Sequence, residues 1–504
     1  MQKTIGIIGG LLVFVLIALI PLDPAAVPHP AQLAAAVTGL MVIWWVTEAI
    51  PIYATALVPL VVFPLLGILS PTAAAVSYGN ETVFLFMGGF FIAAALVRWN
   101  LHRRIALRVI GLAGSETKKL VLGFMVATAF LSMWISNTAS AMMMIPIALA
   151  LVSTLMPGVM TEGEQDGRRQ FATCLLLGVC YSATIGGMAT LIGTPPNAIL
   201  VAQTSGIFPG APGIDFFSWM TFAVPFMALF LLIAWFWLTC VTNRHMPEMI
   251  SGSRDMIGDE LKKLGPLTTA EKWTLLVFIC VAIAWIVRTP KVIGSLVIPG
   301  ITTYIPGVTD ATIAIGGALV LFMLPADAKR GIFTLDWESA KSIPWGILIL
   351  FGGGICLSEG IISSGLAELI AHSFIILAVL PLYAIIFLMV LFIIFLNEVV
   401  SNTAMASIMI PLMAITSVSM GINPMMLMVP AALATSLGFM LPVGTPPNAI
   451  AYGTGYISTK EMARAGFALN IIGCVLITLF MTFVIPAALG ISPELPAWAV
   501  IPGV

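Results

Sequence analysis

The sequence predicts an all-α integral membrane protein that contains an inverted-topology repeat. Apolar side chains make up 60% of the 504 residues and charged side chains only 9%, and the mean hydropathy is +1.10. Soluble globular domains carry about one quarter charged residues, so a soluble enzyme is excluded. Two short motifs also occur twice each, in the same order along the chain. The formal net charge of −1 leaves no basic arm, so we expect no nucleic-acid partner.

The first apolar run, residues 5–22, predicts an uncleaved transmembrane helix that is followed by a loop. This run is longer than the about 7 to 15 apolar residues of a signal-peptide core. The alternative is a signal peptide that is cleaved off. The residues at the end of the apolar run and just after it argue against it, because Pro21, Asp23 and Pro24 fit poorly at a cleavage site. We expect an integral protein of the inner (plasma) membrane of the cell, embedded in membrane lipid.

Apolar runs separated by polar breaks predict eleven transmembrane spans of about 20 residues each. They lie near residues 5–22, 32–49, 53–69, 83–97, 171–204, 217–240, 273–288, 309–324, 343–358, 424–455 and 466–487. Two further apolar stretches, 120–156 and 376–416, each contain Ser-Asn-Thr near the middle, at 136–138 and 401–403. Each stretch is either two short spans or a re-entrant hairpin, and both options return the chain to its starting side.

The distribution of Lys and Arg indicates which way the spans face. With the N-terminus in the cytoplasm, the cytoplasmic segments hold 19 of the 21 Lys and Arg residues, and the external segments hold only Arg288 and Lys291. Cytoplasmic loops of membrane proteins carry such an excess of basic residues. The sequence therefore predicts a cytoplasmic N-terminus.

The chain repeats itself. The segment GTPPNAI occurs without change at residues 193–199 and 444–450. The segment SNTASAMMMIP at 136–146 matches SNTAMASIMIP at 401–411 in eight of eleven positions. Two homologous halves are the simplest interpretation.

The two halves are predicted to lie upside down relative to one another. Five predicted spans separate the equivalent residues Phe86 and Phe351, and an odd number of crossings inverts the second copy. Inverted repeats in secondary transporters bring matching discontinuous helices together around one site at the membrane midplane. We expect a first helix and loop at 1–31; a first inverted repeat at 32–242, with a hairpin at 120–156 and a broken helix at 171–204; a cytoplasmic linker at 243–272; and a second inverted repeat at 273–504, with a hairpin at 376–416 and a broken helix at 424–455.

The two Thr-Pro-Pro motifs predict an interruption in each of two membrane helices. Two consecutive prolines remove two backbone donors and disfavour helix just before them. Within hydrocarbon, the freed carbonyl groups must be satisfied by protein, water or ions. We expect the carbonyl groups of Gly193 and Gly444 to suit a cation, and Asn197 and Asn448 to cap or fix the resumed helices.

The Ser-Asn-Thr turns carry hydroxyl and amide groups, whose oxygens suit sodium and whose donors suit an anion. Helix capping by Ser and Asn is the simpler interpretation, but it does not explain why the two turns match. No Lys or Arg lies near either turn or either Thr-Pro-Pro along the chain. An anion bound there would need co-bound sodium, because a helix terminus supplies only about half a charge.

The remaining polar residues predict no catalytic centre. Glu398 lies three residues before Ser401 and has either an ion or proton role or a structural hydrogen-bonding role. The four histidines show no metal-ligand spacing, and no nucleophile lies in a catalytic pattern. We therefore expect that the protein is not an enzyme.

Together, the paired Ser-Asn-Thr motifs, the paired Gly-Thr-Pro-Pro-Asn-Ala motifs and the segment FLFMGGF at 84–90 resemble the divalent anion:sodium symporter family along nearly the whole chain. This family comprises bacterial and animal carriers of di- and tricarboxylates. The resemblance implies a homodimer in which each subunit has eleven transmembrane helices and two re-entrant hairpins. It also implies an elevator movement of the hairpin-bearing domain against a dimerising scaffold.

The resemblance also implies site residues, through positions that match the family motifs. The first sodium site is expected at Ser132, Ser136, Asn137 and Gly193, and the second at Asn397, Val400, Asn402 and Gly444. Asn397 departs from the family, which tends to have Thr at this position. The substrate carboxylates are expected to bind Asn137, Thr138, Asn402 and Thr403, with Thr194, Pro195, Thr445 and Pro446 beside them.

The resemblance implies sodium-coupled symport of C4-dicarboxylates such as succinate, malate and fumarate, with Na⁺ as the coupling ion. A sodium-independent antiporter that exchanges di- or tricarboxylates is the alternative, and a basic residue beside either turn would favour it. An anion channel is the candidate from a different class. Transport only down the electrochemical gradient of the anion would identify a channel.

Overall fold

The computed structural model describes residues 2–24, 27–154, 162–250, 252–293, 296–374 and 380–501. Eight helical segments in these ranges are long and apolar enough to cross a membrane: His29–Thr47, Pro71–Arg98, Asp166–Gly187, Phe216–Thr242, Thr269–Val287, Trp345–Ser363, Asn402–Ser419 and Thr459–Phe483. Six shorter apolar helices accompany them. The chain therefore has the mostly helical architecture of a membrane protein, and the count of eleven spans stays a prediction.

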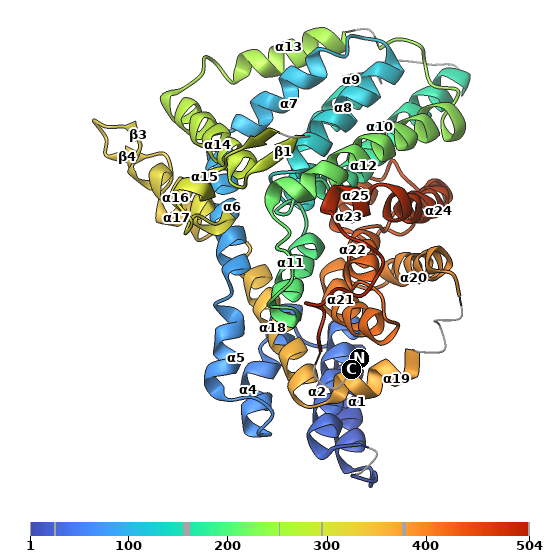
Figure 1. The fold of residues 1–504 in the computed structure, drawn as a ribbon. Coiled ribbons are helices and arrows are strands. Elements are labelled where there is room, and N and C mark those ends of the chain that lie inside the picture. Colours follow the sequence, from blue (N-terminus) through green and yellow to red (C-terminus); the bar gives the residue numbers. More distant parts are fainter. Residues whose placement is uncertain are drawn as a thin grey trace.

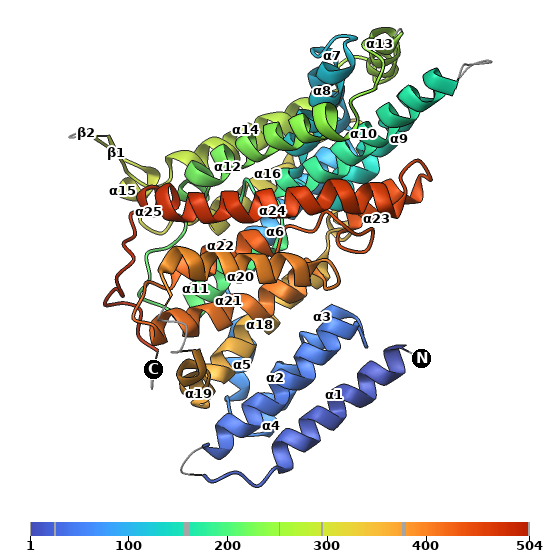
Figure 2. The same ribbon diagram turned by 90° about the vertical axis from the view of Figure 1, so that its right-hand side faces the viewer.

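The chain begins with two helices that pack side by side, α1 (Gln2–Leu19) and α2 (His29–Thr47) (Figure 2). Glycines permit this close approach, since any side chain at Gly6 would collide with Thr47, and one at Gly10 with Trp44. Gly6 and Gly10 are one helical turn apart and share one face of α1. The N-terminal end of α1 therefore packs against the C-terminal end of α2.

The expected span at 53–69 is not one continuous helix. The chain forms α3 (Ile52–Thr55) and, after a break, α4 (Val58–Leu65), which is followed by α5 (Pro71–Tyr78). The break lies just before Pro59, which has no N–H to donate to the carbonyl group of Thr55.

Two series of helices then repeat in the same order. The first contains α6 (Glu81–Arg98), α7 (Leu101–Gly111), α8 (Thr117–Ser132), α9 (Asn137–Thr154), α10 (Glu162–Gly187), α11 (Pro195–Ile207) and α12 (Phe216–Phe236), which a π-helical turn, η1 (Trp237–Thr242), extends. The second contains α18 (Trp345–Ser363), α19 (Leu366–Phe374), α20 (Leu382–Asn397), α21 (Asn402–Ser419), α22 (Met425–Ala434), α23 (Pro446–Gly453) and α24 (Thr459–Phe483), followed by α25 (Ile485–Leu489).

A connecting region joins the two series and contains the only strands in the described ranges. Its helices are α13 (Ser253–Lys263), α14 (Thr269–Val287), α15 (Ile301–Tyr304), α16 (Asp310–Met323) and α17 (Trp337–Ala340). Its strands form two antiparallel hairpins, β1 (Lys291–Ile293) with β2 (Leu296–Ile298), and β3 (Pro325–Asp327) with β4 (Ile332–Phe333). The sequence analysis did not predict these hairpins.

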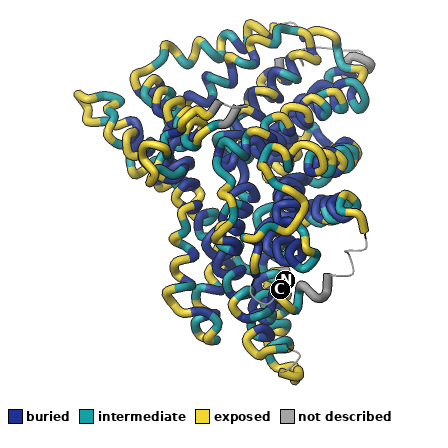
Figure 3. Tube along the Cα trace, viewed as in Figure 1, coloured by how far each residue is buried: buried dark blue, intermediate teal, exposed yellow. Residues whose placement is uncertain are grey.

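The most deeply buried part of the molecule lies where the two series meet. Every residue of α22 is buried, and so is nearly the whole stretch from Phe171 to Leu200 (Figure 3). Helix α11 of the first series packs against α21 of the second, and α23 of the second packs against α9 of the first (Figure 1). Each series therefore covers the helical hairpin of the other.

Candidate binding site at two interrupted helices

The first interruption follows α10. The chain leaves the helix at Gly187 and enters α11 at Pro195, where the two prolines occupy the first helical positions, which need no backbone donor. The side-chain amide of Asn197 donates to the carbonyl oxygens of Gly187 at 3.2 Å and Thr190 at 2.7 Å. Asn197 therefore ties the start of the new helix to the irregular segment.

The second interruption has the same internal geometry. Helix α22 ends at Ala434, and α23 begins at Pro446. The amide of Asn448 donates to the carbonyl oxygens of Gly438 at 2.9 Å and Leu441 at 3.1 Å. These acceptors match Gly187 and Thr190 at the offset of 251 residues that relates the two motifs.

Aromatic donors from other helices satisfy one equivalent carbonyl oxygen in each interruption. Trp219 Nε1 on α12 donates to the oxygen of Met188 at 3.0 Å, and the hydroxyl of Tyr181 on α10 donates to that of Phe439 at 2.8 Å. The sequence analysis missed both residues, because neither belongs to a repeated motif. The carbonyl oxygen of Met188 also accepts the amide of Asn197 at 3.3 Å, whereas Tyr181 spares that of Phe439 the cost of several kcal/mol of an unpaired carbonyl group in an apolar environment.

The helical hairpins α8–α9 and α20–α21 each carry a polar pair at the Ser-Asn-Thr turn. Ser132 Oγ shares its single proton between Asn137 Oδ1 at 2.7 Å and the carbonyl oxygen of Ala183 at 2.6 Å in the first hairpin. Asn397 Nδ2 donates to Asn402 Oδ1 at 3.0 Å in the second. Ser132 and Asn397 are equivalent at the offset of 265 residues, so the two turns share this arrangement although the donor residues differ.

Oxygen atoms gather around the glycines at the first interruption. A side chain at Gly193 would meet the carbonyl oxygens of Gly187 and Ser132, and one at Gly187 would meet Asn137 Oδ1. These oxygens therefore lie directly against the backbone. Such an arrangement of carbonyl and amide oxygens suits a hard cation such as sodium.

Unpartnered oxygens occur at the second interruption as well. Asn397 Oδ1, Asn448 Oδ1 and Thr445 Oγ1 are buried and have no hydrogen-bond partner among the described residues. Asn197 Oδ1 at the first interruption is also buried and has no hydrogen-bond partner among the described residues. A bound cation would satisfy such oxygens, so the residues present fit sodium.

Glu398 has a structural hydrogen-bonding role at the second interruption. Its carboxylate, which is only 3% exposed, accepts the backbone N–H groups of Met440 and Leu441, each at 2.9 Å. It also accepts the amide of Asn470 at 2.6 Å. The first interruption has Met133 at the equivalent position, so the carboxylate makes the second site the more negative one.

A single cavity of about 810 Å³ joins the two turns and the two interruptions. Twelve of the fourteen predicted site residues line it: Ser136, Asn137, Thr138, Gly193, Thr194, Pro195, Val400, Asn402, Thr403, Gly444, Thr445 and Pro446. The other two, Ser132 and Asn397, do not line it. Both are fully buried, and they form hydrogen bonds with the cavity-lining residues Asn137 and Asn402, respectively.

The opposite wall of the cavity comes from the N-terminal helices and carries charge. Lys3, Glu48 and Tyr53 line it, and neither Lys3 nor Glu48 forms an ion pair with a described residue. Glu48 ends α2 in the left-handed conformation, with φ of 46°, which is uncommon for a residue other than glycine. The sequence analysis found no basic residue near the motifs along the chain, and only the fold brings Lys3 to the cavity.

The chain is similar to known proteins along nearly its whole length. The family described as "Sodium:sulfate symporter transmembrane region" matches residues 2–488. The "Sodium-dependent dicarboxylate transporter SdcS" of Staphylococcus saprophyticus is 40% identical over 495 residues, which cover 98% of this chain and 93% of that protein. The protein of the same name in Staphylococcus aureus strain NCTC 8325 is 42% identical with the same coverage.

Two solved structures share the fold at low sequence identity. MtrF of Neisseria gonorrhoeae, described with a class of antimetabolite efflux pumps, has a TM-score of 0.53 at 14% identity and covers 94% of this chain and 97% of its own. The YdaH transporter of Alcanivorax borkumensis has a TM-score of 0.55 at 15% identity, with coverage of 91% and 99%. These two likenesses concern the fold alone.

Proposed function

The chain belongs to the divalent anion:sodium symporter family, and on that premise we propose that it carries C4-dicarboxylates such as succinate, malate and fumarate across the membrane together with sodium. Na⁺ is the coupling ion, in keeping with the relatives named sodium-dependent dicarboxylate transporters. Those relatives are transporters and not enzymes, which supports the same assignment here.

The observation that carries this proposal is the convergence of four motifs on one cavity. Both Ser-Asn-Thr turns and both Gly-Thr-Pro-Pro segments line it, although they are separated by up to about three fifths of the chain. The cavity thus holds a duplicated set of amide, hydroxyl and carbonyl groups at interrupted helices. Secondary transporters bind ions and organic anions with such groups.

Two sodium sites flank the substrate in this proposal. The first uses Ser132, Ser136, Asn137 and Gly193, and its support is the group of oxygens around Gly193. The second uses Asn397, Val400, Asn402 and Gly444, and its support is the unpartnered Asn397 Oδ1 together with the buried carboxylate of Glu398. Both sets consist of oxygen ligands, as sodium requires.

The substrate lies between the sodium sites. Asn137, Thr138, Asn402 and Thr403 bind its carboxylates, and the residues beside them are Thr194, Pro195, Thr445 and Pro446. Apart from Lys3, no Lys or Arg in the described chain lines the cavity. The dianion therefore depends on sodium for charge balance, which makes the ions bind first and the substrate second.

The membrane arrangement is part of the same proposal. The protein has eleven spans, and the hairpins α8–α9 and α20–α21 enter the membrane from opposite sides and turn back within it. The N-terminus lies in the cytoplasm, the protein lies in the inner membrane, and two copies form a dimer. The hairpin-bearing domain moves as an elevator against a scaffold that includes α1 to α3. The repeated helix order and the reciprocal packing of α11 and α23 support the inverted repeat.

Uptake of labelled succinate into proteoliposomes tests the proposal directly. We expect accumulation above the equilibrium level with an inward sodium gradient and almost none when choline replaces sodium. Uptake that is undiminished in choline and requires internal dicarboxylate would instead identify an antiporter. Uptake that never exceeds electrochemical equilibrium would identify a channel. Competition by citrate, tartrate and sulfate would then define the substrate range.

A further inference from the structure

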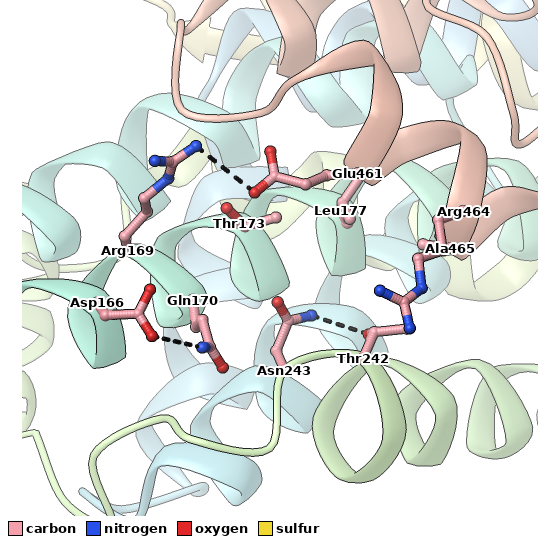
Figure 4. Close-up of a pocket in the computed structure, with 10 residues that line it drawn as sticks. All are labelled: Asp166, Arg169, Gln170, Thr173, Leu177, Thr242, Asn243, Glu461, Arg464 and Ala465. Atoms are coloured by element: carbon pink, nitrogen blue, oxygen red, sulfur yellow. Dashed lines mark hydrogen bonds and ion pairs between the residues drawn. The ribbon is translucent and has the colours of Figure 1, made fainter. Parts of the chain in front are cut away.

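A second polar hollow, of about 360 Å³, lies at the N-terminal ends of α10 and α24 (Figure 4). It shares no lining residue with the cavity described above. Its walls come from three elements, since α10 supplies Arg169, α24 supplies Arg464, and Asn243 follows η1. Its volume is within the range of small-molecule sites.

Hydrogen bonds within the walls, and one between two of them, fix the polar side chains of the hollow. The amide of Gln170 on α10 donates to Asp166 at 2.9 Å, and its oxygen accepts the backbone N–H of His245 at 3.2 Å. The amide of Asn243 donates to the carbonyl oxygen of Leu238 at 3.0 Å. The bond between His245 and Gln170 ties the start of α10 to the segment that follows η1.

The acidic side chains of the hollow are already engaged. Glu461 accepts the backbone N–H of Ser458 at 2.8 Å and its hydroxyl at 2.6 Å, as the capping box of α24. Its contact with Arg169, at 3.7 Å, is longer than a hydrogen bond. Asp166 is held by Gln170, as described above.

The basic side chains, by contrast, have donors to spare. Arg464 is exposed and forms no hydrogen bond or ion pair with any side chain that the structure describes, which at the start of α10 means those from Asp166 onward. Arg168 on α10, Lys460 on α24 and Arg244 in the segment after η1 are sequence neighbours of residues that line the hollow. Within the lining, Arg169 and Arg464 balance the charges of Asp166 and Glu461, and the three neighbouring basic residues come from segments that are far apart along the chain.

The hollow also lies at the ends of two helices that can cross a membrane, Asp166–Gly187 and Thr459–Phe483. This is the level at which lipid head groups meet water. Basic pockets between membrane helices on the cytoplasmic side recognise anionic head groups. Arginine suits a phosphate in particular, because its planar guanidinium donates two parallel hydrogen bonds.

We propose that this hollow is a binding site for a phosphate group, which Arg464 and Arg169 hold from opposite walls. The phosphate belongs either to an anionic phospholipid or to a soluble phosphate compound. The site is independent of the transport cavity, so it stands whether or not the protein carries dicarboxylates.

The experiment uses the purified full chain in nanodiscs of neutral phosphatidylcholine. One arm adds phosphatidylglycerol to the bilayer, and the other adds inorganic phosphate, with sodium chloride as the ionic-strength control. The unfolding temperature, followed by tryptophan fluorescence over a titration of each probe, gives an apparent affinity. Stabilisation by the lipid alone identifies a head group, and stabilisation by free phosphate identifies a soluble ligand.

Variants decide whether the hollow is responsible. We expect Arg464→Gln to weaken the apparent affinity about tenfold, and Arg464→Lys to restore part of it, because lysine keeps the charge but loses the paired donors. Arg254→Gln is the matched control, since Arg254 is exposed on α13 and lies outside the hollow. Arg169→Gln provides a second test if Arg464→Gln does not fold. The proposal is overturned if neither probe stabilises the wild type, or if Arg254→Gln weakens binding as much as Arg464→Gln.

Discussion

Replacing Gly187 by alanine should damage the first sodium site while leaving the fold intact. The new methyl group would overlap Asn137 Oδ1 and lie 3.0 Å from Asn137 Cγ, inside the about 3.4 Å of ordinary contact. The Asn137 side chain must therefore move by about 1 Å or rotate away. Because a side chain and not the backbone has to give way, the helix itself tolerates alanine.

The rotation breaks the hydrogen bond between Ser132 Oγ and Asn137 Oδ1, which is 2.7 Å long. The loss of one such bond costs about 1 kcal/mol, and the displaced oxygen no longer meets the cation. We expect the sodium concentration for half-maximal succinate uptake to rise at least about tenfold, since each factor of ten corresponds to about 1.4 kcal/mol. The unfolding temperature should change little.

The repeat supplies a matched control for this substitution. Gly438 is the equivalent residue in the second half, and a methyl group there would lie 3.5 Å from Asn397 Nδ2 and 3.6 Å from Thr445 Cγ2. These are ordinary contacts, so Gly438→Ala should keep the wild-type sodium dependence. Sodium-dependent uptake in proteoliposomes, measured for both variants at equal protein incorporation, provides the test. A Gly187→Ala protein with wild-type sodium dependence would refute the proposed role of Asn137.

Four further substitutions probe the cavity and the residues that support it. Asn137→Ala and Asn402→Ala should each abolish sodium-dependent uptake and leave expression unchanged. Each substitution removes an amide that the substrate and an ion share in the proposed site. Wild-type uptake rates in both variants would rule out this site. Glu398→Gln should lower the unfolding temperature. The NH₂ group of the glutamine would face a backbone N–H group that the Glu398 carboxylate now accepts, so two donors would meet. An unchanged unfolding temperature would contradict that contact. Lys3→Gln should raise the KM for succinate at low ionic strength and less so at high salt, with Lys3→Arg as the control; a salt-independent effect would exclude an electrostatic role.

The sequence predicted the two helix interruptions because their determinants are local. The prolines after Thr194 and Thr445 dictate where a helix can start, and both start new helices in the structure. The exact repetition of Asn197 as Asn448 pointed to a shared task, and both amides hold the carbonyl groups of an interruption. Such features depend on residues within about ten positions of one another.

The features that the sequence analysis missed depend on contacts across the fold. Tyr181 satisfies a carbonyl group 258 positions away, and no local pattern marks it for that purpose. Lys3 reaches the cavity only because α1 packs on α2 at Gly6. The strands β1 to β4 are two or three residues long, which is too short to produce an alternating pattern.

The packing of α11 on α21 and of α23 on α9 has a consequence for how such a protein could arise. Neither series of helices can cover its own helical hairpin, because the covering helix comes from the other series. If the ancestor was a single unduplicated gene product, it could have worked only as a pair of oppositely inserted chains. On the inverted arrangement proposed above, fusion of the two copies would fix both orientations in one polypeptide, and each copy could then diverge, as at Ser132 and Asn397.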